Sequence, residues 1–177
     1  ALGEPTVDQH VSSQKPFGFR TNFEDYKKRR FEGAVQLYAR GEIGWVDSSL
    51  IKVNPEWVPL WKVLVSRAYG AGEGFPHQIL GSPIIAEPNS CCTETYIVCR
   101  TFKTEVEAQN FEGYLKTRFF RFLVSLRKVT MMVPRDVFNF VPDLSMDEAW
   151  DDAKLYKRYG ITDDEAAYIE SMIKEMA

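Results

Sequence analysis

The sequence has little of what membrane-bound, secreted or metal-binding proteins need. It contains three cysteines and two histidines in 177 residues. An odd number of cysteines, two of them adjacent, argues against a disulfide framework and favours a reducing cytoplasm. No hydrophobic run approaches the roughly 18 to 20 residues required to cross a membrane. The first segment, ALGEPTVDQHVSS, lacks both a basic start and an apolar core, so it does not match a secretory signal.

The few cysteines and histidines also make metal or thiol chemistry a poor interpretation. A structural zinc site needs four Cys or His ligands, usually in close pairs. Here Cys91 and Cys92 are adjacent, Cys99 stands apart, and the histidines are His10 and His77. A cysteine nucleophile with His77 as its base stays open as an alternative. Because free cysteine is among the most buried residue types, we expect three small apolar core residues and no bound cofactor or metal.

What the sequence does contain is charge of two signs, unevenly placed. Residues 1–140 carry 18 Lys and Arg against 15 Asp and Glu, whereas residues 141–177 carry 4 against 10. A cationic body with an acidic tail hints at a polyanionic partner. The missing initiator Met suggests a piece of a longer protein.

The first hundred residues predict strands and loops. AVQLYA and EIGWVD are separated by Arg40-Gly41, which is the spacing of a tight hairpin. Asn54-Pro55 is expected to cap a short helix. Further strands are predicted in WKVLVSRAY, ILGSPIIAE and TETYIVCRTF. The segment between the first two of these, YGAGEGFPHQ, is a predicted loop.

Helices are predicted mainly in the second half. Thr104-x-x-Glu107 is a capping box that opens a long helix over about 104–127, followed by the extended segment MMVPRDVFNFV. Two more capping boxes, Ser145-x-x-Glu148 and Thr162-x-x-Glu165, predict two short helices. We therefore expect an α+β fold in one mixed domain: a twisted, mainly antiparallel sheet, one long packing helix and a short helical tail. The body spans 1–144, with an irregular basic segment at 1–32, and an acidic helical tail spans 145–177.

Two motifs resemble catalytic or cofactor sites. Gly70-Ala-Gly72-Glu-Gly74 has the shape of a nucleotide-binding loop, but Pro76 follows where a helix would have to begin, so a flexible hairpin loop is expected. Pro142-Asp143 with Asp152 and Lys154 has the outline of a metal-dependent nuclease. Asp152 and Lys154 lie in a predicted helix, where residues two apart point in different directions. We therefore expect a solvated acidic helix end there, and the nuclease remains the alternative.

Basic side chains in or beside the predicted loops are the candidate binding residues. Arg and Lys carried by loops on a rigid sheet suit phosphate contacts and the reading of base edges. An ordinary solubilising surface is the competing interpretation. The candidates for DNA binding are Lys15, Arg20, Lys27, Arg29, Arg40, Arg67, Lys128 and Arg135.

Several stretches, in one order along nearly the whole chain, resemble one family. They are KPFGFRTNF, ARGEIGWVD, WKVLVSRAYG, IIAEPNSCCTETYIV, YLKTRFFRFLVSLRK, VFNFVPDLSMDEAWDDAKLYKRYGIT and EAAYIESMI. They resemble the C-terminal target recognition domain of adenine-specific DNA methyltransferases from bacterial restriction–modification systems, including fused type II restriction–methylation enzymes. The resemblance implies a fold similar to the recognition domains of type I specificity subunits.

The resemblance also implies partners and limits. Double-stranded DNA and a catalytic methyltransferase domain that precedes this region would be the partners, with S-adenosylmethionine as that domain's cofactor. The family's [N/D/S]PP[Y/F] catalytic tetrapeptide does not occur here, so this chain alone is not expected to be an enzyme. A cytoplasmic DNA-recognition module is the resulting hypothesis. A protein-interaction module of the same complex, without direct DNA contact, is the alternative.

Overall fold

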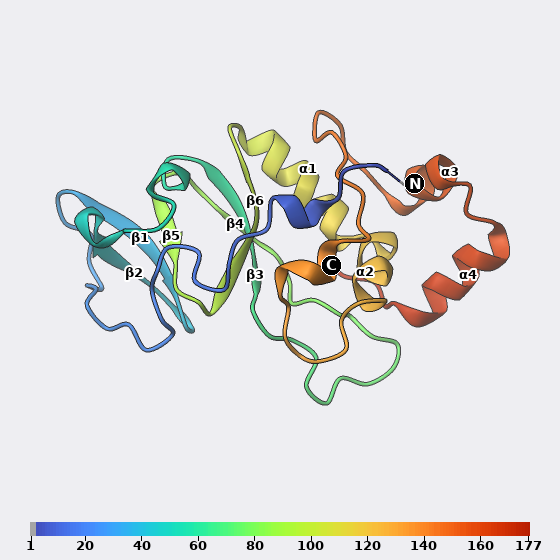
Figure 1. Ribbon diagram of the computed structural model, residues 1–177, viewed down its shortest axis with the longest axis horizontal. Coiled ribbons are helices and arrows are strands. Elements are labelled where there is room, and N and C mark those ends of the chain that lie inside the picture. Colours follow the sequence, from blue (N-terminus) through green and yellow to red (C-terminus); the bar gives the residue numbers. More distant parts are fainter. Residues whose placement is uncertain (1–2) are drawn as a thin grey trace.

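The computed structural model describes residues 3–177, which fold into small sheets at one end and helices at the other (Figure 1). The strands are β1 (Ala34–Ala39), β2 (Glu42–Asp47), β3 (Trp61–Ser66), β4 (Ile84–Ala86), β5 (Ser90–Cys92) and β6 (Tyr96–Phe102). The α-helices are α1 (Glu105–Lys116), α2 (Arg118–Ser125), α3 (Asp152–Tyr159) and α4 (Asp163–Met172). Short 3-10 helices are η1 (Val7–Gln9), η2 (Ser48–Leu50), η3 (Pro55–Trp57) and η4 (Arg135–Phe138).

The strands form two three-stranded sheets, in the orders β2-β1-β5 and β4-β3-β6. β1 pairs antiparallel with β2 across the predicted Arg40-Gly41 turn, and it pairs parallel with β5. β3 pairs antiparallel with both β4 and β6. The α+β class with mainly antiparallel strands is confirmed. The strands are divided between two sheets, where one sheet was expected. The predicted strand TETYIVCRTF begins only at Tyr96, after a turn at residues 93–95, and the preceding Ser90–Cys92 forms β5 in the other sheet.

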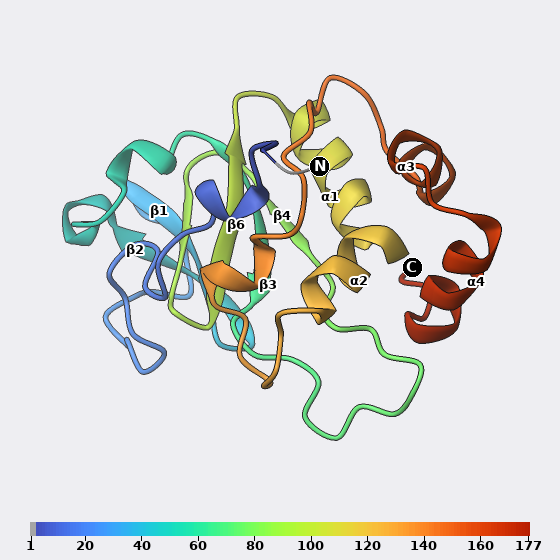
Figure 2. The ribbon, with the colours of Figure 1, turned by 45° about the vertical axis from the view of Figure 1, so that its right-hand side comes forward.

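The sheet β4-β3-β6 lies in the middle and is buried on both faces. Leu64 and Val98 belong to a core cluster shared with the first sheet and with Phe17. Their neighbours Val63 and Cys99 belong to a second cluster, shared with α1 and α2. Since successive side chains of a strand point to opposite faces, this sheet separates two hydrophobic layers. The layers are therefore sheet, sheet and helices, with α3 and α4 beyond them (Figures 1 and 2).

The predicted long helix is broken into α1 and α2, so the expectation for 104–127 is wrong in this respect. The Thr104 capping box is present, but Thr117 adopts extended backbone angles and its hydroxyl accepts from the backbone N–H of Phe120. The fully buried guanidinium of Arg121 donates to the carbonyls of Lys116 and Thr117. The buried guanidinium thus donates to carbonyls at the break between the two helices. These hydrogen bonds reduce the free-energy cost of interrupting a helix inside the core.

Three further local predictions are corrected. Ser145 begins no helix: its hydroxyl accepts from the N–H of Asp147, and Trp150 Nε1 donates to its carbonyl across a turn. The segment predicted as extended after α2 contains η4. Asn54 precedes η3 as expected, but its side chain donates to the carbonyl of Pro16 instead of capping that helix. Thr162, by contrast, forms the predicted capping box of α4.

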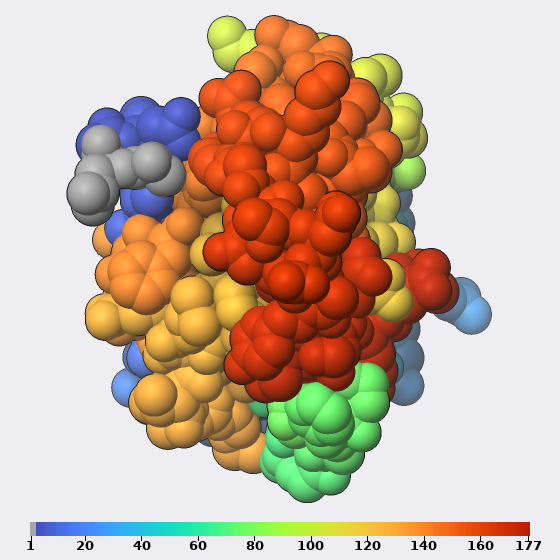
Figure 3. All heavy atoms as spheres, turned by 90° about the vertical axis from the view of Figure 1, so that its right-hand side faces the viewer, coloured from blue at the N-terminus to red at the C-terminus, as the bar shows by residue number. Residues whose placement is uncertain are grey.

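The acidic helical tail forms one end of the molecule. Figure 3 shows α3 and α4 covering this face, with a green segment, the loop after β3, protruding beneath α4. The first sheet and residues 15–32 lie at the opposite end, whereas the start of the described chain lies beside α3, where Glu4 pairs with Arg158 (Figure 1). In the part of the chain that the structure describes, no helix combines the length and the hydrophobicity of a membrane span.

Candidate nucleic-acid interface

The carboxyl ends of β1, β3 and β5 meet at the turn formed by residues 93–95. The backbone of this turn makes hydrogen bonds of 2.9 to 3.0 Å with the backbone of Phe19, Tyr38 and Arg67. Phe19 lies in the N-terminal segment, Tyr38 lies in β1, and Arg67 directly follows β3. The turn therefore brings together chain segments that are distant in the sequence.

The loops around this turn lie on one side of the molecule. Tyr69 N donates to the carbonyl of Met131 at 2.8 Å and Val133 N donates to that of Arg67 at 2.8 Å, so the loops after β3 and after α2 are joined. We call this surface the loop edge; it comprises residues 17–22, 40–41, 67–80, 93–95 and 127–133. The blue, green and orange loops all extend downward in Figures 1 and 2, which differ by a turn about the vertical axis.

Four of the eight candidate residues lie at the loop edge. Arg20 and Arg40 are exposed. Arg67 is half-buried and its guanidinium lies 3.2 Å from the carboxylate of Glu94, which also accepts from the backbone N–H of residue 21. Lys128 Nζ donates to the carbonyl of residue 69 at 2.8 Å, and burial lowers the pKa of its ammonium. Arg20 and Arg40 thus form no ion pair within residues 3–177, whereas Arg67 and Lys128 are bound to neighbouring loops.

Lys27 and Arg29 lie on a neighbouring segment that is attached to β2. Lys27 and Trp45 exchange two backbone hydrogen bonds of 2.8 Å. A Cβ on Gly44 would lie 2.3 Å from the ring of Tyr26, so the glycine at this position lets the segment approach the strand. The basic run is therefore held on a sheet, although the sequence alone predicted only an irregular segment.

Aromatic rings that the sequence did not single out as binding residues are interleaved with this basic run. Lys27 Nζ lies 4.8 Å from the ring centroid of Phe31, and the Arg30 guanidinium lies 5.4 Å from that of Trp45. Lys27, Phe31 and Trp45 line a hollow of about 290 Å³ whose lining also includes Asp25 and Asp47. Rings and cations side by side are the usual surface for contacts with bases and phosphates. The alternation of Trp45 with the buried Gly44 and Val46 in β2 was the available signal.

Lys15 and Arg135 lie apart from the loop edge as defined. Lys15 is exposed on the segment before Phe17. Arg135 Nε donates to the carbonyl of Val11 at 2.8 Å, which ties η4 to the N-terminal segment. The structure thus gives Arg135 a structural contact and leaves Lys15 without an assigned role.

The residues of the nuclease alternative are not brought together. Asp143 lies 2.7 Å from His10 Nε2 and 2.6 Å from Arg100 Nη1. Burial alone would raise the pKa of Asp143, but these two partners lower it below its ordinary value. Asp152 instead accepts from two backbone amides at the start of α2, and Lys154 binds a backbone carbonyl of its own segment. Asp143, Asp152 and Lys154 thus each bind different partners, and this arrangement favours structural roles for all three.

The cysteines are buried, as predicted. Burial raises the pKa of Cys91 to about 12 and also raises the pKa values of Cys92 and Cys99. Thiols with such pKa values are poor nucleophiles near neutral pH. The glycine-rich segment 70–74 is a loop, as expected, and the next helix begins only after β6. Among residues 3–177 no group of three or more His, Cys, Asp or Glu side chains is placed to hold a metal ion.

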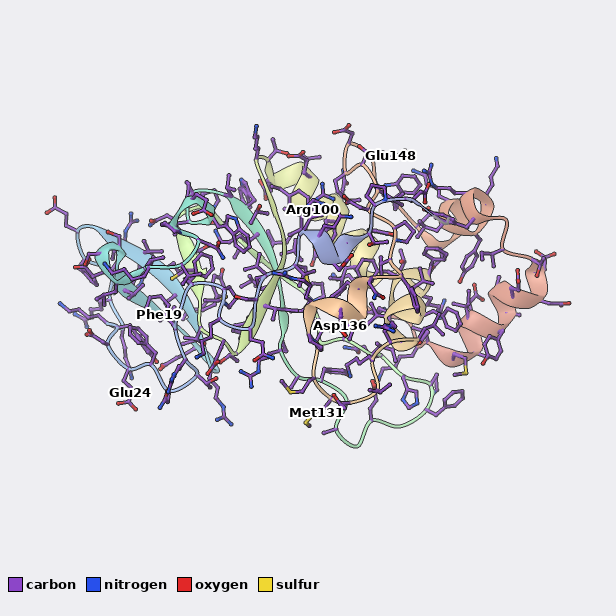
Figure 4. All side chains as sticks on the ribbon, viewed as in Figure 1. Phe19, Glu24, Arg100, Met131, Asp136 and Glu148 are labelled. Carbon is purple, nitrogen blue, oxygen red and sulfur yellow. The ribbon has the colours of Figure 1, made fainter. Side chains whose placement is uncertain are left out.

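The loop edge and the basic segment on β2 are therefore suited to binding a polyanion. Figure 4 labels Glu24 and Met131 on the lower side, among these loops, whereas Arg100 and Glu148 lie on the upper side. Comparison of the chain with protein-family models, with curated proteins and with solved structures gave no match.

Proposed function

We propose that this chain is a DNA-recognition module that holds duplex DNA for an adenine-specific methyltransferase domain of a restriction–modification enzyme. The loop edge would face the duplex. The chain itself would supply binding and selectivity, while the separate catalytic domain would supply S-adenosylmethionine and the methyl transfer. The observation that carries the proposal is that the turn at residues 93–95 is bonded to the backbone of Phe19, Tyr38 and Arg67, which joins at one place the three segments that carry Arg20, Arg40 and Arg67.

The distribution of charge supports this orientation. Residues 15–30 carry six Lys and Arg against two Asp and Glu, and they lie at the end opposite the acidic tail. Phosphates approaching from the loop edge would meet cations on projecting loops, and α3 would stay away from the duplex, whereas the end of α4 lies beside the loop at residues 67–80. Side chains on such loops can position the backbone and read base edges, each good base contact contributing about 1 to 3 kcal/mol of discrimination.

The test is a binding titration of the full chain against short duplex DNA at several salt concentrations. Arg20→Gln and Arg40→Gln should each weaken binding and reduce the slope of log affinity against log salt by about 1, because each removes one phosphate contact. Lys157→Gln, an exposed change on α3, is the matched control and should alter neither quantity. Equal effects of all three variants would contradict the placement of the interface.

A protein-docking role is the second candidate, and one hollow favours it. Phe122, Ile161 and Tyr168 line an apolar depression of about 380 Å³ between α2 and α4, with Asp164 and Glu165 at its rim. This surface is suited to a segment with apolar and basic residues, such as one from a neighbouring catalytic domain. Binding of such a domain that depends on Tyr168 but is insensitive to Arg20 would assign docking to this end of the molecule.

A further inference from the structure

The loop between β3 and β4 carries an exposed aromatic ring, Phe75, whose centroid lies 5.6 Å from that of the His77 ring in an edge-to-face arrangement. Phe75 is 64% exposed, compared with 56% for Tyr168 and 48% for Phe140. The loop extends beyond the body on the side of the loop edge (Figures 2 and 3). Single exposed apolar residues are common on protein surfaces, so the exposure of Phe75 is only a starting point.

This loop is internally braced, which distinguishes Phe75 from an incidental exposed residue. The carboxylate of Glu73 accepts from the backbone N–H of Gln78 at 2.6 Å and of Ile79 at 3.4 Å, and from the hydroxyl of Tyr69 at 3.2 Å. Burial alone would raise the pKa of Glu73, but these hydrogen bonds lower it below its ordinary value. The Glu73 side chain is only 11% exposed, so its carboxylate bonds mainly to groups of the loop and little to solvent.

The stem of the loop is fixed to three other parts of the molecule. Lys128 Nζ donates to the carbonyl of Tyr69 at 2.8 Å. Arg121 Nη1 donates to that of Gln78 at 3.2 Å. The backbone of His77 exchanges hydrogen bonds of 3.0 Å with the chain at the end of α4. A ring held on such a frame loses little conformational freedom when a partner covers it.

Residues 69–76 of the loop present no charge outward. Glu73 is the one charged residue in the stretch from 69 to 76, and its carboxylate is turned inward. A Cβ added to Gly74 would meet no atom within 4 Å, and no left-handed backbone angle requires glycine there. The fold itself therefore gives no reason for glycine beside Phe75, whereas the close approach of a partner would give one.

From these observations we propose that Phe75 is a wedge that inserts between two adjacent base pairs of the bound duplex. This inference rests on the proposed function, because it requires the loop edge to face DNA. Arg67 and Lys128 lie at the foot of the loop and would contact the flanking phosphates. Proteins that insert Phe or Leu side chains between base steps unstack and kink the duplex in this way.

The test detects unstacked thymines by permanganate in a pool of short duplexes with randomised centres, after separation of the protein-bound fraction. The wild-type chain should raise thymine reactivity above that of free duplex. Phe75→Ala should return the reactivity to background and weaken binding by about tenfold, the order expected when one aromatic stacking contact is lost. Phe75→Leu keeps an apolar wedge and should retain part of the enhanced reactivity. Tyr168→Ala, which removes an exposed ring on α4, should leave the reactivity unchanged.

The outcomes separate this inference from the proposed function. Salt-dependent duplex binding without enhanced thymine reactivity would overturn the wedge and leave DNA recognition standing. The same reactivity in wild type and Phe75→Ala would also overturn it. Failure of the wild-type chain to bind duplex would overturn both proposals.

Discussion

At the scale of single residues, Glu94 limits the positive charge of the loop edge. Its carboxylate lies 3.2 Å from the Arg67 guanidinium and is 16% exposed. A carboxylate at this position would repel phosphate and would also hold Arg67 in place. The two effects oppose each other, and their balance can be measured.

We expect Glu94→Gln to increase the affinity for duplex DNA several-fold. The change removes one negative charge near the phosphates and releases Arg67, while the amide oxygen can still accept from the backbone N–H of Thr21. Titrations at low and high salt check this, with the larger gain at low salt. Glu148→Gln, on the upper side in Figure 4, is the matched control. Weaker binding by Glu94→Gln would mean that the ion pair holds Arg67 in the position that binds phosphate and that its loss outweighs the removal of a negative charge.

Arg121 is a residue whose role is structural. Its fully buried guanidinium donates to four backbone carbonyls, those of Lys116, Thr117, Gln78 and Lys174. These contacts join the break between α1 and α2 to the loop that carries Phe75 and to the C-terminal segment. Burial lowers the pKa of this guanidinium to about 10, so it stays charged at neutral pH.

Arg121→Met should lower the free energy of unfolding by about 3 kcal/mol, because it removes a buried guanidinium from four carbonyls, of which those of Gln78 and Thr117 keep a backbone donor and those of Lys116 and Lys174 lose theirs. Arg127→Met, an exposed change just beyond α2, should stay within about 0.5 kcal/mol. Urea denaturation followed by tryptophan fluorescence measures both. Similar stabilities of the two variants would contradict the clamp described for Arg121.

At the scale of elements, two similar capping sequences had different outcomes. Thr162 and Glu165 form a capping box at the start of α4, whereas Ser145 stands in a turn. Around Ser145 a tertiary contact is present: Asn110 Nδ2 of α1 donates to the carbonyl of Met146 at 2.8 Å, and Trp150 Nε1 donates to the carbonyl of Ser145 and closes the turn. Local sequence supplies a start signal for a helix, but it does not contain the contacts that decide between helix and turn.

Thr162→Ala should therefore cost about 1 kcal/mol of stability, because a helix N-terminus loses its cap. Ser145→Ala, which removes a hydroxyl from a turn, should cost less than about 0.5 kcal/mol. Comparing the urea midpoints of the two variants, at unchanged denaturant slope, checks the difference. A loss at Ser145 as large as that at Thr162 would show that the turn is stabilised by this hydroxyl as strongly as the helix.

The elements that the sequence predicted well depend on local signals. The Arg40-Gly41 hairpin and the Thr104 capping box need only neighbouring residues, and both are present. The break at Thr117 was missed because the apolar stripe continues across it, and the buried partner that supports it, Arg121, looks like an ordinary helical arginine in the sequence. Periodicity reports the buried face of a helix and is insensitive to one interrupted turn.

At the scale of the whole molecule, the sequence identified basic residues but not their arrangement. The segments that carry Arg20, Arg40 and Arg67 are joined because the backbone of residues 93–95 bonds to Phe19, Tyr38 and Arg67. Those bonds depend on long-range pairing, including the parallel pairing of β1 with β5, which no local pattern predicts. The division between a basic end and an acidic end was visible in the counts of charged residues, and the structure places the two ends apart (Figure 1).

The salt dependence of duplex binding by the full chain tests the central claim most directly. If the loop edge contacts phosphates, the logarithm of the affinity should fall linearly as the logarithm of the salt concentration rises, with a slope of about −0.9 per phosphate contacted. The account predicts a slope that corresponds to several contacts and that becomes shallower by about 1 in Arg20→Gln. Binding that is absent at low salt, or that does not change with salt, would contradict it.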